Sequence, residues 1–253
     1  MRLPRISNHD ELDPLEHEPG VVLRFVERPE ELAGADLVIL PGSKATAADL
    51  AWLRASGLAD AVMSRAGRGD LVLGICGGFQ MLGRALLDPD GVEGQEPEVP
   101  GLGLLPVVTT FRREKTTARV LGALEPSALF AAGAARGYEI HMGEVQRLEG
   151  APPALRLTAR NGEPCDIEDG AVSPGGAVVG TLVHGLLEDD AVRAGLLARL
   201  RARRGLPAPA SPPVATREEE YDRLADALAA HLDWTLLCSA AGLPALPRPG
   251  ART

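Results

Sequence analysis

The feature that most constrains this chain is an apolar run that leads directly into a cysteine followed by two glycines. Leu71–Ile75 (LVLGI) carries no charged side chain, and Cys76, Gly77 and Gly78 come immediately after it. An uninterrupted apolar run of this kind is typical of a strand that is buried on both faces of a sheet. The residues after the glycines have the pattern of a helix, so the sequence predicts a strand, a tight turn at Cys76 and a helix.

Cys76 has the surroundings of a nucleophile. Gly74 and Gly77 permit a strained turn that lifts the cysteine side chain above the sheet edge. The helix that follows directs its N-terminus at the sulfur, which favours the thiolate, and the N–H of Gly77 is placed to stabilise an oxyanion. A free cysteine is more often a small buried apolar residue. We expect that simpler role for Cys238 in an apolar helix end, and neither it nor Cys165 has the context of Cys76.

Short apolar runs bounded by Gly or Pro recur along the chain and predict strands. The expected strands lie at residues 21–26, 36–40, 71–75 and 177–183, and weaker patterns lie at 104–110, 117–120 and 138–142. Residues 88–101 are rich in Asp, Glu, Gly and Pro, which predicts a loop.

Helical patterns separate these strands. Thr46 and Asp49 have the spacing of a capping box, which predicts a helix with Thr46 as its N-cap. Further helices are expected at 58–65, after Cys76 through Leu86, at 191–203 and at 217–237. The alternation predicts an α/β domain with a mainly parallel central sheet and helices on its faces.

The 253 residues are enough for one large domain of this class. We expect a core at about residues 1–204, a Pro/Ala-rich linker at about 205–216 and an amphipathic C-terminal helix at about 217–238.

A thiolate nucleophile needs an imidazole that holds its proton and later passes it to the leaving group. Of the five histidines, His184 directly follows the strong strand pattern at 177–183. Functional groups gather at the carboxyl ends of the strands in an open α/β sheet, and Cys76 has the same kind of position. His141 remains an alternative base. The other three histidines lie in the polar N-terminal segment or within a helix.

The sequence PGSK at residues 41–44 also follows an expected strand. A glycine there can bring a backbone N–H close to a ligand, which would complete an oxyanion hole with two donors. The segment is not a phosphate loop, because the pattern G-x-x-x-x-G-K-[ST] does not occur in the chain.

Charge and cysteine content exclude several classes of partner. The net charge of -9, with no Lys/Arg patch, argues against nucleic acid or an anionic membrane surface. Three scattered cysteines suggest neither a disulfide framework nor a metal site. The first residues are too polar for a signal peptide and no apolar run is long enough to span a membrane, so we expect a cytoplasmic protein.

Four segments together carry a resemblance to a known family. They are LPGSK at residues 40–44, GICGGFQMLG at 74–83, GYEIHMG at 137–143 and GTLVHGL at 180–186. The set resembles the class I glutamine amidotransferases, and within that superfamily the glutaminase domains of the cobyric acid synthase family. Further matches, such as LPRISN at 3–8 and DPDGVEG at 88–94, extend the resemblance over nearly the whole chain.

The resemblance implies a flavodoxin-like α/β fold and a set of site residues. Cys76 would be the nucleophile and His184 its catalytic partner. The backbone N–H groups of Gly42 or Ser43 and of Gly77 would form the oxyanion hole. Gln80 would help to hold the substrate glutamine.

One position departs from the superfamily pattern. Many class I glutaminases carry a Glu two residues after the catalytic His, and this chain has Leu186 there. What orients His184 is then open. Glu188 and Asp189 are the candidates, although a helix N-terminus is the simpler place for both.

The resemblance also implies partners that this chain lacks. The family's ATP-binding synthetase half, with ATP and Mg²⁺, lies N-terminal to the glutaminase half and is absent here, so this chain should bind no cofactor or metal itself. Glutamine would be its substrate, and the corrinoid would bind to the partner. Two alternatives are the glutaminase of a related amidoligase, of the cobyrinic acid a,c-diamide synthase or lipid II amidation type, and a module that keeps the fold without turnover.

Overall fold

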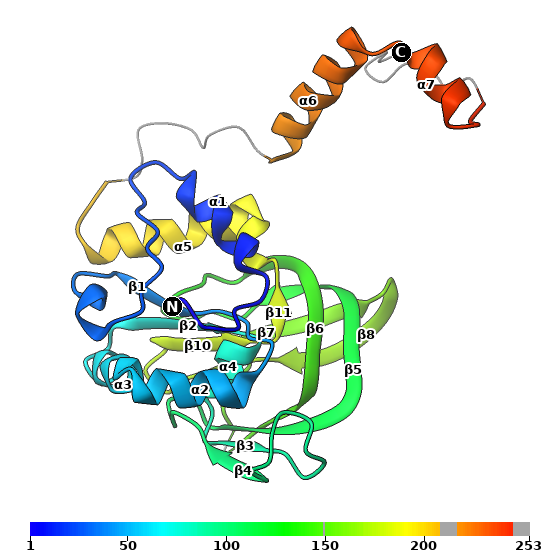
Figure 1. Cartoon of the computed structure of the whole chain (residues 1–253). Coiled ribbons are helices and arrows are strands. Elements are labelled where there is room, and N and C mark those ends of the chain that lie inside the picture. The colour runs from blue at the N-terminus through cyan, green and yellow to red at the C-terminus, as the bar shows by residue number, and fades with distance from the viewer. Residues whose placement is uncertain (149, 208–216, 245–253) are drawn as a thin grey trace. The chain divides into compact units, whose positions relative to one another are not determined.

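The computed structural model describes residues 1–148, 150–207 and 217–244, which fall into two compact units (Figure 1). The larger unit contains Met1–Glu16 and the chain from Val21 through the end of helix α5 (Asp190–Arg203). The smaller unit includes helices α6 (Arg217–His231) and α7 (Trp234–Ala240). None of the described helices has the length and apolar character needed to cross a membrane.

The predicted parallel sheet is present in the larger unit. Its four strands have the order β1 (Leu37–Leu40), β2 (Leu71–Ile75), β10 (Val178–Thr181) and β9 (Ala171–Val172). The first three are parallel, and β9 is antiparallel to β10. Both β2 and β10 are fully buried, as their apolar sequences require. Because Leu40, Gly74 and Gly180 share one register, the three parallel strands end at the same edge.

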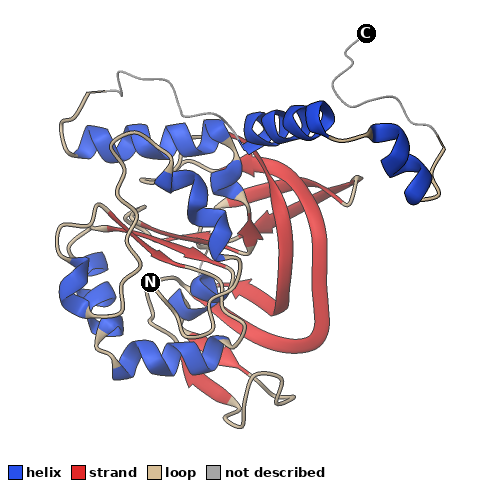
Figure 2. Ribbon diagram, turned by 45° about the horizontal axis from the view of Figure 1, so that its top comes forward, coloured by secondary structure: helices blue, strands red, loops and turns tan. Residues whose placement is uncertain are grey.

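Helices lie on both faces of this sheet, as Figures 1 and 2 show. Helices α2 (Thr46–Ala55) and α3 (Leu58–Gly67) lie on one side, and α5 lies on the other. The short helix α4 (Gly77–Leu82) follows β2 directly. Two clusters of buried apolar side chains form the core of the described fold. The α/β class predicted from the sequence is therefore confirmed.

A second sheet, with seven strands, was not predicted. Strands β5 (Val107–Leu124) and β6 (Gly133–Arg147) form a long antiparallel pair within it. Its other strands are β3 (Ala85–Leu87), β4 (Glu98–Pro100), β7 (Leu155–Arg160), β8 (Glu163–Asp169) and β11 (Val183–His184). The sequence patterns detected only fragments of β5 and β6, because polar side chains alternate with buried ones along both.

Two strand predictions were wrong in part. Residues 21–26 form no named strand, and the Val26 carbonyl accepts a hydrogen bond from the Arg2 N–H. The run at 177–183 is divided between β10 and β11, one in each sheet. At the break, the Asp169 carboxylate accepts hydrogen bonds from the Thr181 hydroxyl and the Leu182 N–H. These side-chain bonds replace ladder bonds and redirect the chain.

Three helix predictions also need correction. Helix α2 has Ala45 rather than Thr46 at its N-cap, and Asp49 accepts a hydrogen bond from Ser43. Helix α4 ends at Leu82, so Leu86 belongs to strand β3. The expected helix at 217–237 is two helices, since Asp233 caps α7 by accepting from the Leu236 N–H. Most of the expected linker, residues 208–216, lies outside the described residues.

The remaining described elements are short. They are the 3-10 helices η1 (His9–Leu12), η2 (Pro29–Leu32) and η3 (Leu186–Glu188), and helix α1 (Asp13–Glu16). The segment at 88–101 is a loop as expected, apart from β4.

Candidate active site

Cys76 occupies a strained turn between β2 and α4. Its backbone φ is 49° and its ψ is -110°, values that a residue with a side chain adopts only where the surroundings enforce them. The Cys76 N–H donates to the Thr181 carbonyl of the neighbouring strand at 2.8 Å, and its carbonyl accepts from the Gln80 N–H at 3.0 Å. The turn is thus fixed both by the sheet and by the first turn of the helix.

Gly78 allows helix α4 to lie directly against the end of β1. A Cβ added at Gly78 would lie 2.0 Å from the Leu40 carbonyl oxygen, so no larger residue fits without movement of the backbone. This close contact sets the distance between the helix and the sheet. The direction of the helix N-terminus toward the Cys76 side chain depends on it.

His184 lies at the carboxyl edge of the sheet and is almost completely buried, with 1% of its surface exposed. Its Nδ1 is 3.1 Å from both carboxylate oxygens of Glu11, which is buried in η1. A Glu11 oxygen also accepts a hydrogen bond from the Gly185 N–H at 3.2 Å. Glu11 therefore fixes both the ring and the turn that follows it.

Glu11 was not found by sequence reasoning, which considered Glu188 and Asp189 instead. Asp189 accepts hydrogen bonds from the N–H groups of Ala191 and Val192 as the N-cap of α5. Glu188 is exposed. Asp189 therefore stabilises a helix N-terminus, which is the simpler of the two roles considered from the sequence.

Cys76 and Glu11 set the charge of His184. Burial alone would lower the pKa of His184, but the Cys76 sulfur and the Glu11 carboxylate outweigh it and raise that pKa to about 10. At neutral pH the imidazole therefore holds a proton, which suits a thiolate partner. Nε2, the nitrogen opposite the Glu11 contact, makes no hydrogen bond of ordinary geometry with any described residue.

Tyr138 covers one face of the His184 ring. The two ring centroids are 5.3 Å apart and the planes are inclined by 15°, which is a stacked arrangement. The two residues are direct partners across β6 and β11, and the Tyr138 hydroxyl accepts a hydrogen bond from Asn8 at 3.2 Å. An aromatic face beside an imidazolium stabilises the protonated ring.

We expect Tyr138→Leu to slow alkylation of Cys76 by iodoacetamide about 2- to 5-fold at neutral pH, because loss of the aromatic face disfavours the imidazolium that accompanies the thiolate. Tyr138→Phe keeps the stacked ring and should react at the wild-type rate. Peptide mass spectrometry can follow Cys76 separately from Cys165. An equal loss in both variants would assign the effect to the hydroxyl and its bond to Asn8 instead.

The expected backbone donors lie beside Cys76. A Cβ added at Gly77 would lie 2.8 Å from the Ser43 nitrogen, and one at Gly42 would lie 3.1 Å from Cε1 of His184. In the described part of the chain, neither the Ser43 N–H nor the Gly77 N–H donates to another backbone group. Both therefore remain available to a ligand oxygen at the cysteine.

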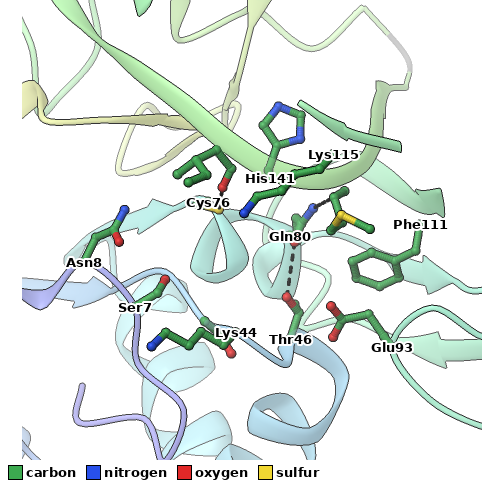
Figure 3. Close-up of a pocket in the computed structure, with 13 residues that line it drawn as sticks. Ser7, Asn8, Lys44, Thr46, Cys76, Gln80, Glu93, Phe111, Lys115 and His141 are labelled. Atoms are coloured by element: carbon green, nitrogen blue, oxygen red, sulfur yellow. Dashed lines mark hydrogen bonds between the residues drawn. The ribbon is translucent and has the colours of Figure 1, made fainter. Parts of the chain in front are cut away.

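A cavity of about 290 Å³ opens at Cys76 (Figure 3). Gln80 forms part of its wall, with its Nε2 donating to the Met142 carbonyl at 3.0 Å and its Oε1 accepting from Thr46 at 3.3 Å. The charged side chains of Lys44, Glu93 and Lys115 also line the cavity, as does the titratable side chain of His141. Its volume and mixed polar lining suit a small polar molecule.

His141, the alternative base, lies in the cavity wall but faces other partners. Its Nδ1 is 3.1 Å from the Gly143 carbonyl, and its Nε2 is 3.7 Å from the carboxylate of Glu139. Glu139 in turn forms an ion pair with Arg160 at 2.6 Å. The structure thus places His184, rather than His141, in the interaction with Cys76.

Solved structures share this fold at low sequence identity. One described as PurLQS from Thermotoga maritima has a TM-score of 0.59 and 17% identity, covering 80% of this chain and 96% of that one. A second, described as a glutamine amidotransferase, has a TM-score of 0.52 and 19% identity, covering 79% and 96%. At these identities the likeness concerns the fold alone.

Sequence relatives are much closer. A cobyric acid synthase of Sorangium cellulosum is 55% identical over 96% of this chain and 50% of its own length. The one from Moorella thermoacetica is 44% identical over 96% of this chain and 48% of its own length. This chain therefore spans about half the length of the curated relatives that it matches.

The model of the CobB/CobQ-like glutamine amidotransferase domain matches residues 1–192, which include Cys76, His184 and every residue that lines the cavity. This match covers most of the chain and both sheets of the fold. The chain belongs to the family of CobB/CobQ-like glutamine amidotransferase domains.

Proposed function

We propose that Cys76 is the nucleophile of a glutaminase, with His184 as its acid and base and Glu11 as the residue that orients His184. One observation carries this proposal: the buried imidazole interacts with Cys76, which lines a cavity, and also lies 3.1 Å from the Glu11 carboxylate. Nucleophile, base and orienting acid form the three-part arrangement that acyl transfer requires.

The reaction proceeds through a covalent intermediate. The Cys76 thiolate attacks the side-chain amide carbon of glutamine, and the N–H groups of Gly77 and of Ser43 or Gly42 stabilise the oxyanion. The imidazolium of His184 gives its proton to the leaving nitrogen, which departs as ammonia. The neutral imidazole then takes a proton from water, which hydrolyses the thioester to glutamate and restores the thiolate.

Gln80 forms the part of the cavity wall that contacts the substrate side chain. Its amide already bonds to Met142 and Thr46, so its position is fixed before the substrate arrives. Gln80 therefore shapes the cavity near Cys76 and presents a polar surface in a fixed position.

We further propose that the ammonia serves an ATP-dependent amidation on a synthetase half. Relatives named cobyric acid synthase are about twice as long as the matched region, and the reaction would convert adenosylcobyrinic acid a,c-diamide to cobyric acid. ATP, Mg²⁺ and the corrinoid would bind to that half. The rim formed by residues 138–143 and 88–101 would contact it, and a cytoplasmic location fits these substrates.

Treatment with 6-diazo-5-oxo-norleucine, a reactive glutamine analogue, tests the glutaminase site. We expect one adduct per chain in the intact-protein mass of the wild type and none in Cys76→Ala, because the diazoketone reacts with a nucleophile in a glutamine pocket. Cys165→Ala is the matched control and should react like the wild type. An equal adduct on Cys76→Ala would contradict the assignment, and no adduct on any protein would show that this chain forms no glutamine site by itself.

A further inference from the structure

Glu93 presents an unsatisfied carboxylate oxygen to the active-site cavity. The side chain is half-buried and lines the same cavity as Cys76 and Gln80. Its Oε2 is buried and finds no hydrogen-bond partner in the part of the chain that the structure describes. Figure 3 shows the carboxylate directed toward Thr46. A buried carboxylate oxygen without a partner is costly, so this position points to a ligand that would satisfy it.

The loop that carries Glu93 is held in place by Asp88. The Asp88 carboxylate accepts hydrogen bonds from the N–H groups of Val92 and Glu93 at 2.7 Å and of Gly94 at 3.0 Å. Asp88 itself is buried. An ordered loop of this kind presents the Glu93 side chain in one position rather than leaving it in solvent.

The environment of Glu93 favours a cation. Burial raises the pKa of Glu93, the backbone N–H groups of Ala47 and Thr46 lower it, and the carboxylates of Asp88 and Asp49 raise it further. Lys44 and Lys115 line the same cavity, but neither forms an ion pair with a described residue. The protein thus supplies negative charge around Glu93 and leaves its buried oxygen without a positive partner.

We propose that Glu93 binds the α-ammonium group of glutamine and makes the site selective for α-amino acid amides over simple amides. The proposal rests on the proposed glutaminase function. The substrate's amide would lie at Cys76 and its charged amino acid end at Glu93, in one cavity. A charge-assisted hydrogen bond to Oε2 would then satisfy the buried oxygen.

Protection of Cys76 against iodoacetamide measures this interaction directly. L-glutamine is compared with glutaramate, which differs only in having hydrogen in place of the α-amino group. We expect Glu93→Gln to raise the half-protecting concentration of glutamine about 10- to 100-fold and to change that of glutaramate by less than about twofold. Peptide mass spectrometry follows Cys76 alone. Glu96→Gln, at an exposed position of the same loop, is the matched control and should leave both values unchanged.

Each other outcome overturns the proposal in a recognisable way. If Glu93→Gln weakens protection by both compounds equally, Glu93 supports the N-terminus of α2 rather than the ammonium group. If it weakens neither, Glu93 does not contact the substrate, while the glutaminase assignment stands on the labelling of Cys76 by 6-diazo-5-oxo-norleucine. If the wild type is neither protected nor labelled, the glutaminase function fails and this inference fails with it.

Discussion

Glu11→Gln is expected to slow acylation of Cys76 by about 10²- to 10⁴-fold while the protein stays folded. The carboxylate accepts a hydrogen bond from the Nδ1–H of His184, which leaves Nε2 to exchange a proton with Cys76. A glutamine amide can direct its NH₂ at Nδ1, and the ring then carries its proton on the wrong nitrogen. In the serine protease triad, the corresponding change of acid to amide costs about 10⁴-fold.

Removal of the Glu11 charge is expected to slow the acylation of Cys76 as well. The interactions with Cys76 and with Glu11 raise the pKa of His184 against the effect of burial. Without the Glu11 charge this pKa falls toward its ordinary range, and the protonated imidazole that accompanies the thiolate becomes less stable. The glutamine amide oxygen can still accept from the Gly185 N–H, so the local backbone should be retained.

The rate of Cys76 labelling by 6-diazo-5-oxo-norleucine gives the measurement. Glu16→Gln, an exposed position at the end of helix α1, is the matched control and should label at the wild-type rate. Thermal melting checks that each variant is folded. A folded Glu11→Gln protein that labels within threefold of the wild type would show that His184 needs no acidic partner.

The central part of the site could be predicted from sequence because its signals are local. The strand at Leu71–Ile75 was predicted with the bounds that the structure has, since an uninterrupted apolar run that ends at a cysteine and two glycines is recognised without knowledge of the fold. Cys76 and His184 each follow such a run directly. Their meeting at one edge follows from the parallel sheet, because the ends of β2 and β10 share a register.

Glu11 and Glu93 could not be found in this way. Glu11 is 173 residues from His184 in the sequence and lies in a polar segment that resembles an ordinary surface loop. Nothing in the local pattern distinguishes it from Glu16 or Glu18. The role of Glu11 depends on its burial in the folded protein. A single sequence does not reveal this burial, because Glu11 lies in one short 3-10 turn.

The second sheet was missed for a related physical reason. Buried residues alternate with less buried ones along parts of both β5 and β6, and the middle of β5 carries a run of polar side chains at residues 112–117. Strand preference depends on the neighbours across the sheet, which local patterns cannot supply. The same limit explains the single strand expected at 177–183, where the bond from Thr181 to Asp169 divides the run between two sheets.

Gly78→Ala is expected to lower the free energy of unfolding by about 3 kcal/mol. The new Cβ would lie 2.0 Å from the Leu40 carbonyl oxygen and 2.5 Å from its carbon, and both atoms belong to the backbone of β1. A flexible side chain cannot move aside here, so α4 or the strand end must shift. For a domain of this size the loss corresponds to a fall in Tm of about 6–12 °C. Because α4 begins at Gly77, next to Cys76, labelling of Cys76 should fall in the same variant.

Gly67→Ala is the matched control for this effect. Gly67 is the last residue of α3, and a Cβ added there meets no atom within 4 Å. Alanine in a helix is favoured over glycine by about 0.5–1 kcal/mol, so the Tm should stay the same or rise slightly. A Gly78→Ala protein that melts within 2 °C of the wild type and labels normally would show that α4 can move away from β1 at little cost. In that case the close approach of the helix would not be what holds Cys76 in its strained conformation.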